Sequence, residues 1–250
     1  MAKDRNQEVD SHTGWWDRYF RQSVRPLASL AFVLPLMLVY EVGVLVLGPE
    51  AIRNGADVLM RQLLDMLGFG QYFVLPVATC VILLAWHHMR REPWRFSPRV
   101  LAVMFAESVA WALLLFAVHC VMTGIAANIA AAVPGQGQNG DKLATLVAFC
   151  GAGLYEELLF RLILLSATMG VIRVAGGSPR ATAIVAVVVT SLVFSAAHYK
   201  PFMSFGEPFE WYSFVFRTLA GGFFAVLYLR RGFGIAAGAH AFYDVITQIF

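Results

Sequence analysis

Two adjacent glutamates and an arginine stand in the middle of an apolar stretch, in the run Gly153-Leu-Tyr-Glu156-Glu157-Leu-Leu-Phe-Arg161. Charged side chains are costly within a lipid bilayer, so an intramembrane acid is by default a functional residue. Glu157 lies four residues before Arg161, the order that favours an ion pair across one helical turn. Glu156 is left unpaired, and we predict that it acts as a general base. The alternative is that both acids only pair helices.

Two histidines follow in separate apolar runs, each with a companion residue four positions away. Phe194 precedes His198, and Asp244 follows His240. Residues at this spacing share one face of a helix, so Asp244 can hold the His240 imidazole in one tautomer or share in binding an oxyanion. A single histidine of this kind is more often a hydrogen-bonded core residue. The combination of both histidines with Glu156 favours a catalytic site.

These three motifs resemble those of the CPBP intramembrane proteases, which include type II CAAX prenyl endopeptidases, bacteriocin-processing and self-immunity proteins and relatives of myxosortases. In that family an arginine lies four residues after the second of two glutamates, and Phe–His and His–Asn or His–Asp pairs follow at the same spacing. The resemblance covers about residues 143–249 and includes the run from Gly221 to Gly232. Asp244 stands where many members have asparagine, and an aspartate donates a hydrogen bond only when it is protonated.

The resemblance implies a role for each motif residue. Glu156, with help from His198, would activate the attacking water molecule. His240 and Asp244 would stabilise the oxyanion of the tetrahedral intermediate. The remaining motif residues would support the site: Glu157, Arg161 and Phe194.

Other peptidase chemistries lack their motifs in this chain. There is no His-Glu-x-x-His zinc motif, no Gly-x-Ser-Gly-like nucleophile turn, and no second intramembrane aspartate to form an aspartyl dyad. A zinc ion could still be bound by Glu156, His198 and His240, with a fourth position left open. We predict a site without a metal or other cofactor, because these ligands would come from three separate helices.

Long apolar runs must position these residues. The chain has 250 residues, of which 59% are hydrophobic and 14% are charged, proportions outside those of ordinary soluble domains. Runs long enough to cross a bilayer lie near 27–47, 72–88, 100–123, 143–169, 181–199, 212–229 and 233–249. They predict an all-α, polytopic bundle of about seven transmembrane helices around an intramembrane catalytic cavity. We expect a polar, interfacial N-terminal segment at 1–25 and a single membrane domain at 26–250, with its catalytic core at about 143–249.

Arginines alternate with neutral or mixed connections between these runs. The basic connections hold Arg18, Arg21 and Arg25; Arg90, Arg91, Arg95 and Arg99; Arg173 and Arg180; and Arg230 and Arg231. Because cytoplasmic loops carry an excess of cations, we predict a cytoplasmic N-terminus in a bacterial inner membrane. The connection from Pro201 to Glu210 is rich in Phe, Pro and Gly, and we expect it to dip back over a cavity.

The predicted function is an intramembrane endopeptidase that acts on a membrane-associated or lipidated protein or peptide. The alternative is a non-enzymatic membrane protein, either a proton-coupled transporter or an immunity or scaffold protein. No internal repeat is visible, which weakens the transporter alternative. The net charge of +3 and the lack of a polybasic tract exclude nucleic acid as an expected partner.

Several intramembrane polar residues have no partner at helical spacing and stay outside the predicted site: Glu41, Glu107, His119 and Asn128. Arg217 has two interpretations. It either extends to the membrane surface beside Glu210, which is favoured, or binds a substrate carboxylate.

Overall fold

The computed structural model describes residues 14–48, 53–70, 72–129, 142–200 and 206–249. These residues form helices and connecting turns, with no β-strand among them. Outside this part of the chain lie the polar start of the predicted N-terminal segment, the predicted turn at 134–141, residues 201–205 of the predicted re-entrant connection, and the Asn128 side chain.

The elements follow one another in the order of the predicted apolar runs. They are α2 (Trp15–Ser23), α3 (Pro26–Leu47), α4 (Gly55–Met66), α5 (Val74–Met89), α6 (Pro98–Ile129), α7 (Lys142–Gly151), η2 (Ala152–Glu156), η3 (Leu158–Leu165), α8 (Ser166–Val174), α9 (Pro179–Ala196), α10 (Trp211–Arg231) and α11 (Phe233–Ile249). Each of the seven predicted runs lies largely within a helix.

Four of these helical segments have the length and hydropathy needed to cross a membrane: α3, residues Pro98–Gly124 of α6, α9 and α10. Helix α5 is also apolar but shorter. Large apolar side chains such as Val46, Val77 and Ile184 are exposed on the outside of the bundle. An apolar outer surface of this kind is suited to lipid. The protein is therefore an all-α integral membrane protein.

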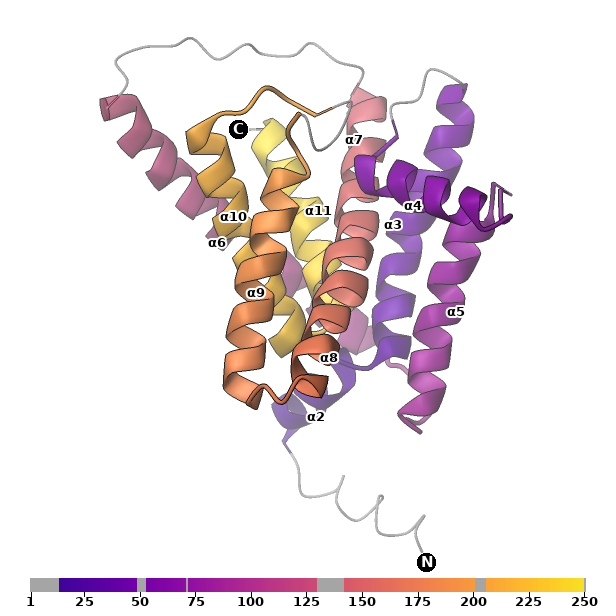
Figure 1. The fold of residues 1–250 in the computed structure, drawn as a ribbon. Helices are drawn as coiled ribbons and strands as arrows, with labels where there is room; N and C mark the ends of the chain where they lie inside the picture. The colour runs from indigo at the N-terminus through magenta and orange to yellow at the C-terminus, as the bar shows by residue number, and fades with distance from the viewer. Residues whose placement is uncertain (1–13, 49–52, 71, 130–141, 201–205, 250) are drawn as a thin grey trace, which may run out of the picture.

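Helix α11 forms the centre of the bundle, where it packs against α6, α10, α3 and the helix that begins with α7 (Figure 1). Residues 233–241 are all buried. Small residues allow this close packing, since a Cβ atom at Gly234 would lie 2.9 Å from Ser29 Cα. Gly232 has a φ of 82°, which lets the chain pass from α10 into α11 across a single residue.

The helix that carries the two glutamates changes its hydrogen-bonding pattern along its length. It is an α-helix in α7, has π-type hydrogen bonding in η2 and η3, and returns to α in α8. A π turn contains an extra residue, and such turns are frequent at functional sites. Glu156 and Glu157 lie where the two π segments meet, so an ideal α-helix would give their directions incorrectly.

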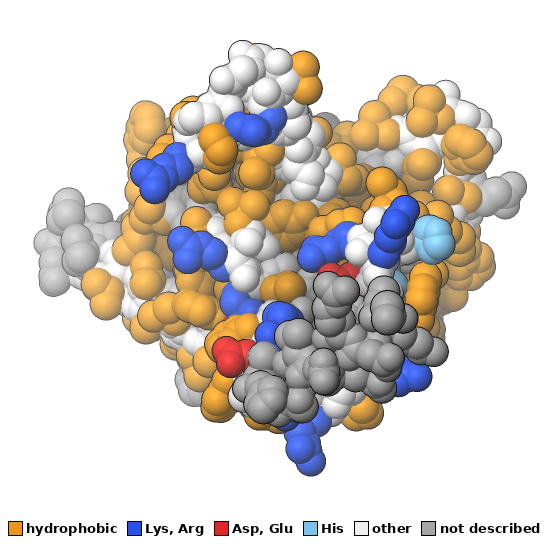
Figure 2. Space-filling model, turned by 90° about the horizontal axis from the view of Figure 1, so that it is seen from below, with side chains coloured by type: hydrophobic (Ala, Val, Ile, Leu, Met, Phe, Trp, Pro, Cys, Tyr) orange, Lys and Arg blue, Asp and Glu red, His pale blue; other side chains and the backbone are white. Residues whose placement is uncertain are grey.

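The two ends of the bundle differ in charge. Figure 2 views the end at which α2 lies, and basic side chains are spread across it. This is the end where α5 finishes, α6 begins, α8 connects to α9, and α10 connects to α11 (Figure 1). The predicted basic connections therefore share one face. At the opposite end, the short helix α4 lies across the long helices (Figure 1).

Candidate active site

Three side chains from different helices meet inside the bundle. Glu156 ends η2, His198 lies just beyond the last turn of α9, and His240 lies in α11. Glu156 Oε2 is 3.9 Å from His198 Nε2 and 3.9 Å from His240 Nε2. These separations are too long for direct hydrogen bonds but suit a bridging water molecule. The structure thus brings together the three residues predicted to carry the chemistry.

Glu156 has a hydrogen-bond partner that the sequence did not reveal. Asn54 donates from Nδ2 to Glu156 Oε1 over 2.7 Å. Asn54 is also the N-cap of α4, where its Oδ1 accepts from the Ala56 amide at 2.9 Å. The sequence prediction concerned a partner on the same helix, whereas Asn54 lies 102 positions away in the chain. The available signal was an asparagine just before an amphipathic helix, which is typical of an N-cap.

Glu157 connects the arginine to the second histidine. Its Oε2 lies 3.2 Å from Arg161 Nε, so the predicted ion pair is present. Its Oε1 accepts a 2.8 Å hydrogen bond from His240 Nδ1. Both Glu157 and Arg161 are almost fully buried. The ring of Phe224 stacks on His240, with centroids 4.5 Å apart. Glu157 therefore fixes the orientation of His240 as well as neutralising Arg161.

Asp244 faces the other nitrogen of His240. Its Oδ2 is 3.7 Å from His240 Nε2, the nitrogen that also faces Glu156. Because Glu157 occupies Nδ1, Asp244 does not set the orientation of the imidazole through that atom. Asp244 therefore lies on the same side of His240 as Glu156.

Phe194 lies between the three motifs. Its backbone carbonyl accepts a 2.8 Å hydrogen bond from His198 Nδ1. Its ring lies against the Arg161 guanidinium at 4.4 Å and makes an edge contact with His198 at 4.9 Å. A cation over an aromatic ring is stabilised by the ring's electrons. Phe194 therefore contacts both Arg161, the ion-pair partner of Glu157, and His198.

Two cavities reach Glu156 and His198. The larger has a volume of about 410 Å³, and the smaller has a volume of about 240 Å³. The larger is lined by His119, Glu156, Phe194, His198, Glu210, Tyr212, Ser213, Phe216, Arg217, Ala220, Phe224, His240, Tyr243 and Asp244. The smaller is lined by residues that include Asn54, Leu159 and Glu207. The site therefore has room beside the reacting groups for part of a peptide.

His119, which the sequence analysis left outside the site, and Arg217, for which it gave two interpretations, both line the larger cavity. The His119 imidazole is hydrogen-bonded to the Tyr243 hydroxyl at 3.1 Å. Arg217 donates to both carboxylate oxygens of Glu207, at 2.9 and 3.0 Å. The favoured prediction placed Arg217 beside Glu210. The structure instead pairs it with Glu207, which also lies on the connection before α10.

The described part of the predicted re-entrant connection folds back beside His198. The Glu207 amide donates to the His198 carbonyl at 2.8 Å, and the Lys200 amide donates to the Glu207 carbonyl at 3.0 Å. A Cβ atom at Gly206 would lie 2.6 Å from the Tyr199 carbonyl carbon, so only glycine fits this close approach. Residues 206–210 therefore form one wall above the site.

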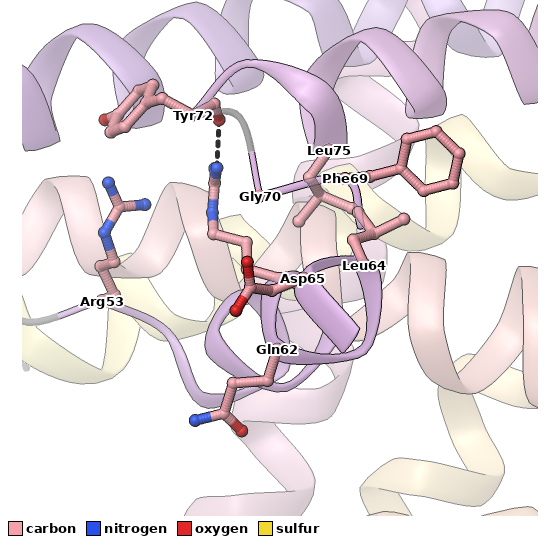
Figure 3. Close-up of a pocket in the computed structure, with 9 residues that line it drawn as sticks. Arg53, Gln62, Leu64, Asp65, Phe69, Gly70, Tyr72 and Leu75 are labelled. Carbon is pink, nitrogen blue, oxygen red and sulfur yellow. Dashed lines mark hydrogen bonds between the residues drawn. The ribbon is translucent and has the colours of Figure 1, made fainter. Parts of the chain in front are cut away.

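Charged residues in and beside α4 form a network next to Asn54. Asp57 receives hydrogen bonds from Arg53, Arg61 and Tyr40. Glu41 pairs with Arg61 at 3.0 Å and accepts a hydrogen bond from Tyr155, the residue before Glu156. Arg61 donates to the Tyr72 carbonyl at the edge of a separate pocket, and Figure 3 marks a hydrogen bond to this carbonyl with a dashed line. Glu41 therefore has partners, but they lie on other helices.

Glu107 lies at the opposite end of the bundle, away from the site. Its carboxylate accepts hydrogen bonds from Arg231 Nε at 2.6 Å and from the Tyr19 hydroxyl. It therefore joins α2, α6 and α10.

The side chains of the alternative zinc site, Glu156, His198 and His240, lie farther apart in this structure than the ligands of one zinc ion. Across the described residues, no three His, Cys, Asp or Glu side chains are arranged to hold a metal ion. Ligand atoms on one tetrahedral zinc would lie about 3.3 Å apart at normal bond lengths. The separations from Glu156 to His198 and His240 are wider, at 3.9 Å.

Comparison with known proteins identifies one family. Residues 139–246 match the family model described as "Type II CAAX prenyl endopeptidase Rce1-like". No curated protein and no solved structure matches the chain. The matched region contains all three motifs and therefore Glu156, His198 and His240, whereas Asn54 lies outside it. Residues 139–246 are therefore similar to the Rce1-like family, and this similarity implies a peptidase.

Proposed function

We propose that this protein is an intramembrane endopeptidase in which Glu156 activates a water molecule to hydrolyse a peptide bond. The observation that carries the proposal is the pair of 3.9 Å separations from Glu156 Oε2 to the two histidine Nε2 atoms. A water molecule between these atoms would contact the base and both imidazoles at once.

The tautomer of His198 supports this use of the water. A backbone carbonyl can only accept, so His198 Nδ1 carries the hydrogen in its bond to Phe194. A neutral His198 then has a lone pair at Nε2, facing Glu156. The water can donate one hydrogen to Glu156 and the other to His198, which leaves its lone pairs directed at the substrate carbonyl carbon.

His240 is suited to the developing negative charge. Its Nδ1 donates to Glu157, and its Nε2 faces both Glu156 and Asp244. Two carboxylates favour a proton on Nε2, and a protonated Nε2 can donate to an oxyanion. Asp244 would thus act by holding a proton on His240, a role that an aspartate can fill without donating a hydrogen bond itself.

The reaction balances with these residues alone. Glu156 accepts a proton as the water oxygen bonds to the carbonyl carbon, and the carbonyl electron pair moves to the oxygen facing His240. When the intermediate collapses, the carbon–nitrogen bond breaks and the proton held by Glu156 passes to the leaving amine. The site is then ready for another water molecule.

The proposed substrate is a membrane-associated or lipidated protein or peptide. Two features support it: the similarity of residues 139–246 to the Rce1-like family, and the partly aromatic lining of the larger cavity, which includes Phe194, Phe216 and Phe224. We further propose that the protein resides in a bacterial inner membrane with its N-terminus in the cytoplasm, and that it uses no metal. Nucleic acid is not a proposed partner.

The test compares wild-type protein with Glu156→Gln in native cells and after purification. Glutamine can still accept the hydrogen bond from Asn54 but cannot take a proton from water, so turnover should fall about 100-fold or more while binding survives. In cells, an unprocessed membrane or exported protein should accumulate. Unchanged processing in the Glu156→Gln cells would refute the proposal.

Metal dependence is tested on the same purified protein by exhaustive chelation and metal analysis. We expect activity to survive chelation. Stoichiometric zinc, with activity lost on removal and regained on addition, would instead assign Glu156, His198 and His240 as zinc ligands.

A further inference from the structure

The arginines mark one end of the bundle and the catalytic residues approach the other. Helix α9 begins at Pro179, at the end of the bundle where α2 lies, and His198 follows its far end (Figure 1). Helix α10 runs the opposite way, from the cavity residues Tyr212 and Ser213 to Arg231 at the basic face. Both helices therefore place the site towards the end of the bundle opposite the basic face.

Both cavities reach the surface at this second end. Glu210 lines the larger cavity and Glu207 lines the smaller, and both side chains are exposed. Glu156 and His240 are the buried side of the larger cavity, since Glu156 is only 12% exposed and His240 only 7%. The open side of the site thus faces away from the arginine-rich face.

Cations at the second end are mostly neutralised by acids. Arg53 pairs with Asp57 at 2.9 Å, Arg61 pairs with Glu41 at 3.0 Å, and Arg217 pairs with Glu207 at 2.9 Å. Lys142 and Lys200 are the other described cations at this end. The basic end carries the larger group named above, from Arg18 to Arg231. The excess of lysine and arginine in short connections marks the cytoplasmic side.

We infer that the catalytic cavity opens on the extracytoplasmic side of the membrane, and that its substrate is an exported or membrane-anchored protein cleaved from that side. The substrate part of this inference rests on the proposed function, whereas the direction of opening rests only on the arrangement of charge and cavity. A protein whose scissile bond stays in the cytoplasm would meet the arginine-rich face, where neither of the two cavities opens.

The direction of opening is tested with single cysteines in a variant lacking Cys80, Cys120 and Cys150. Intact bacterial cells are treated with a membrane-impermeant maleimide. Glu210→Cys, at the cavity rim, should be labelled in intact cells. Arg180→Cys, at the basic face, should be labelled only after lysis.

A second matched pair, Pro208→Cys and Arg173→Cys, guards against failure of either first variant to fold. Labelling of the Arg180 or Arg173 variants in intact cells, or of the Glu210 or Pro208 variants only after lysis, would overturn the inference. Because labelling needs no turnover, it can be repeated in the Glu156→Gln background, and the result is independent of catalysis.

The substrate side is tested by mapping new protein termini in membrane and exported fractions of wild-type and Glu156→Gln cells. Termini lost in the variant should lie on extracytoplasmic segments. Termini on cytoplasmic segments would overturn the substrate class. If the cysteines are labelled as expected but no termini are lost, both the substrate class and the proposed peptidase function are rejected. The direction in which the cavity opens is then still supported.

Discussion

Asn54 gives Glu156 a hydrogen bond that no residue of the motif helix supplies. The Asn54→Ser variant should separate this bond from the capping of α4, because serine caps a helix well but is too short to reach Glu156. We expect turnover to fall about 10- to 100-fold, since a hydrogen bond to a charged group contributes about 1.5–3 kcal/mol. The thermal unfolding midpoint should change little.

The Asn54→Ala variant is the control, because alanine removes both the cap and the bond to Glu156. Its turnover should match that of Asn54→Ser, while its free energy of unfolding should be lower by about 1 kcal/mol. Full turnover in Asn54→Ser would show that Glu156 does not need this donor.

Arg161 is the cation of a buried pair, so its loss should harm folding as well as catalysis. Arg161→Leu leaves Glu157 with His240 as its remaining partner and removes the contact with the Phe194 ring. Breaking a buried pair in this way typically costs about 3–5 kcal/mol. Protein accumulation in membranes and the unfolding midpoint in detergent should both fall, and less so in Arg161→Lys. A stable, fully active Arg161→Leu protein would show that His240 alone neutralises Glu157.

The contact between η2 and α11 sets the distance between the glutamates and His240. A Cβ atom at Gly153 would lie 2.6 Å from Ala241 Cβ and 2.7 Å from the Ala237 carbonyl oxygen. Gly153→Ala must therefore push the two elements apart. We expect turnover to fall at least about tenfold, because small misplacements of reacting groups are costly.

Gly170 offers a matched control in the same continuous helix. Nothing lies within 4 Å of a Cβ atom at Gly170, so Gly170→Ala should leave turnover unchanged and, as a helical glycine-to-alanine change, stabilise by about 0.5–1 kcal/mol. Equal turnover in both variants, measured on purified protein, would argue against the close approach at Gly153.

The elements show where sequence patterns are informative and where they stop. Hydropathy located the seven helical runs because each is continuous in the chain. It did not predict the π segments around Glu156, since hydropathy does not report which backbone groups bond to one another. Likewise, the i,i+4 spacing predicted the pair of Glu157 and Arg161. It could not predict the pair of Glu157 and His240, because these two residues are 83 positions apart.

At the scale of the whole molecule, Glu107 ties three helices together far from the site. It accepts hydrogen bonds from Arg231 of α10 and Tyr19 of α2. Glu107→Gln should lower the free energy of unfolding by about 2–3 kcal/mol, because it weakens charged hydrogen bonds in a partly buried cluster. Turnover of the folded protein should stay close to that of the wild type.

The pair of Arg25 and Glu92, with nitrogen and oxygen 3.1 Å apart, provides the comparison, because its side chains are 19% and 23% exposed against 10% and 17% for Arg231 and Glu107. Glu92→Gln should cost less than about 1 kcal/mol, as is usual for pairs that water can reach. Thermal unfolding and turnover of both variants are measured in the same detergent. A Glu107→Gln protein as stable as Glu92→Gln would show that the cluster does not hold α2 in place.

Helix α4 lies across the end of the bundle while the base it supports lies deeper, so Asn54 joins a surface helix to a buried carboxylate (Figure 1). A change in bilayer thickness would shift α4 relative to the long helices, since a helix with a polar and an apolar face follows the lipid headgroups. Turnover in vesicles of defined acyl-chain length should therefore pass through a maximum. In Asn54→Ser, which lacks the hydrogen bond to Glu156, turnover should depend less on acyl-chain length. In the wild-type protein, bilayer thickness would thus regulate turnover through Asn54.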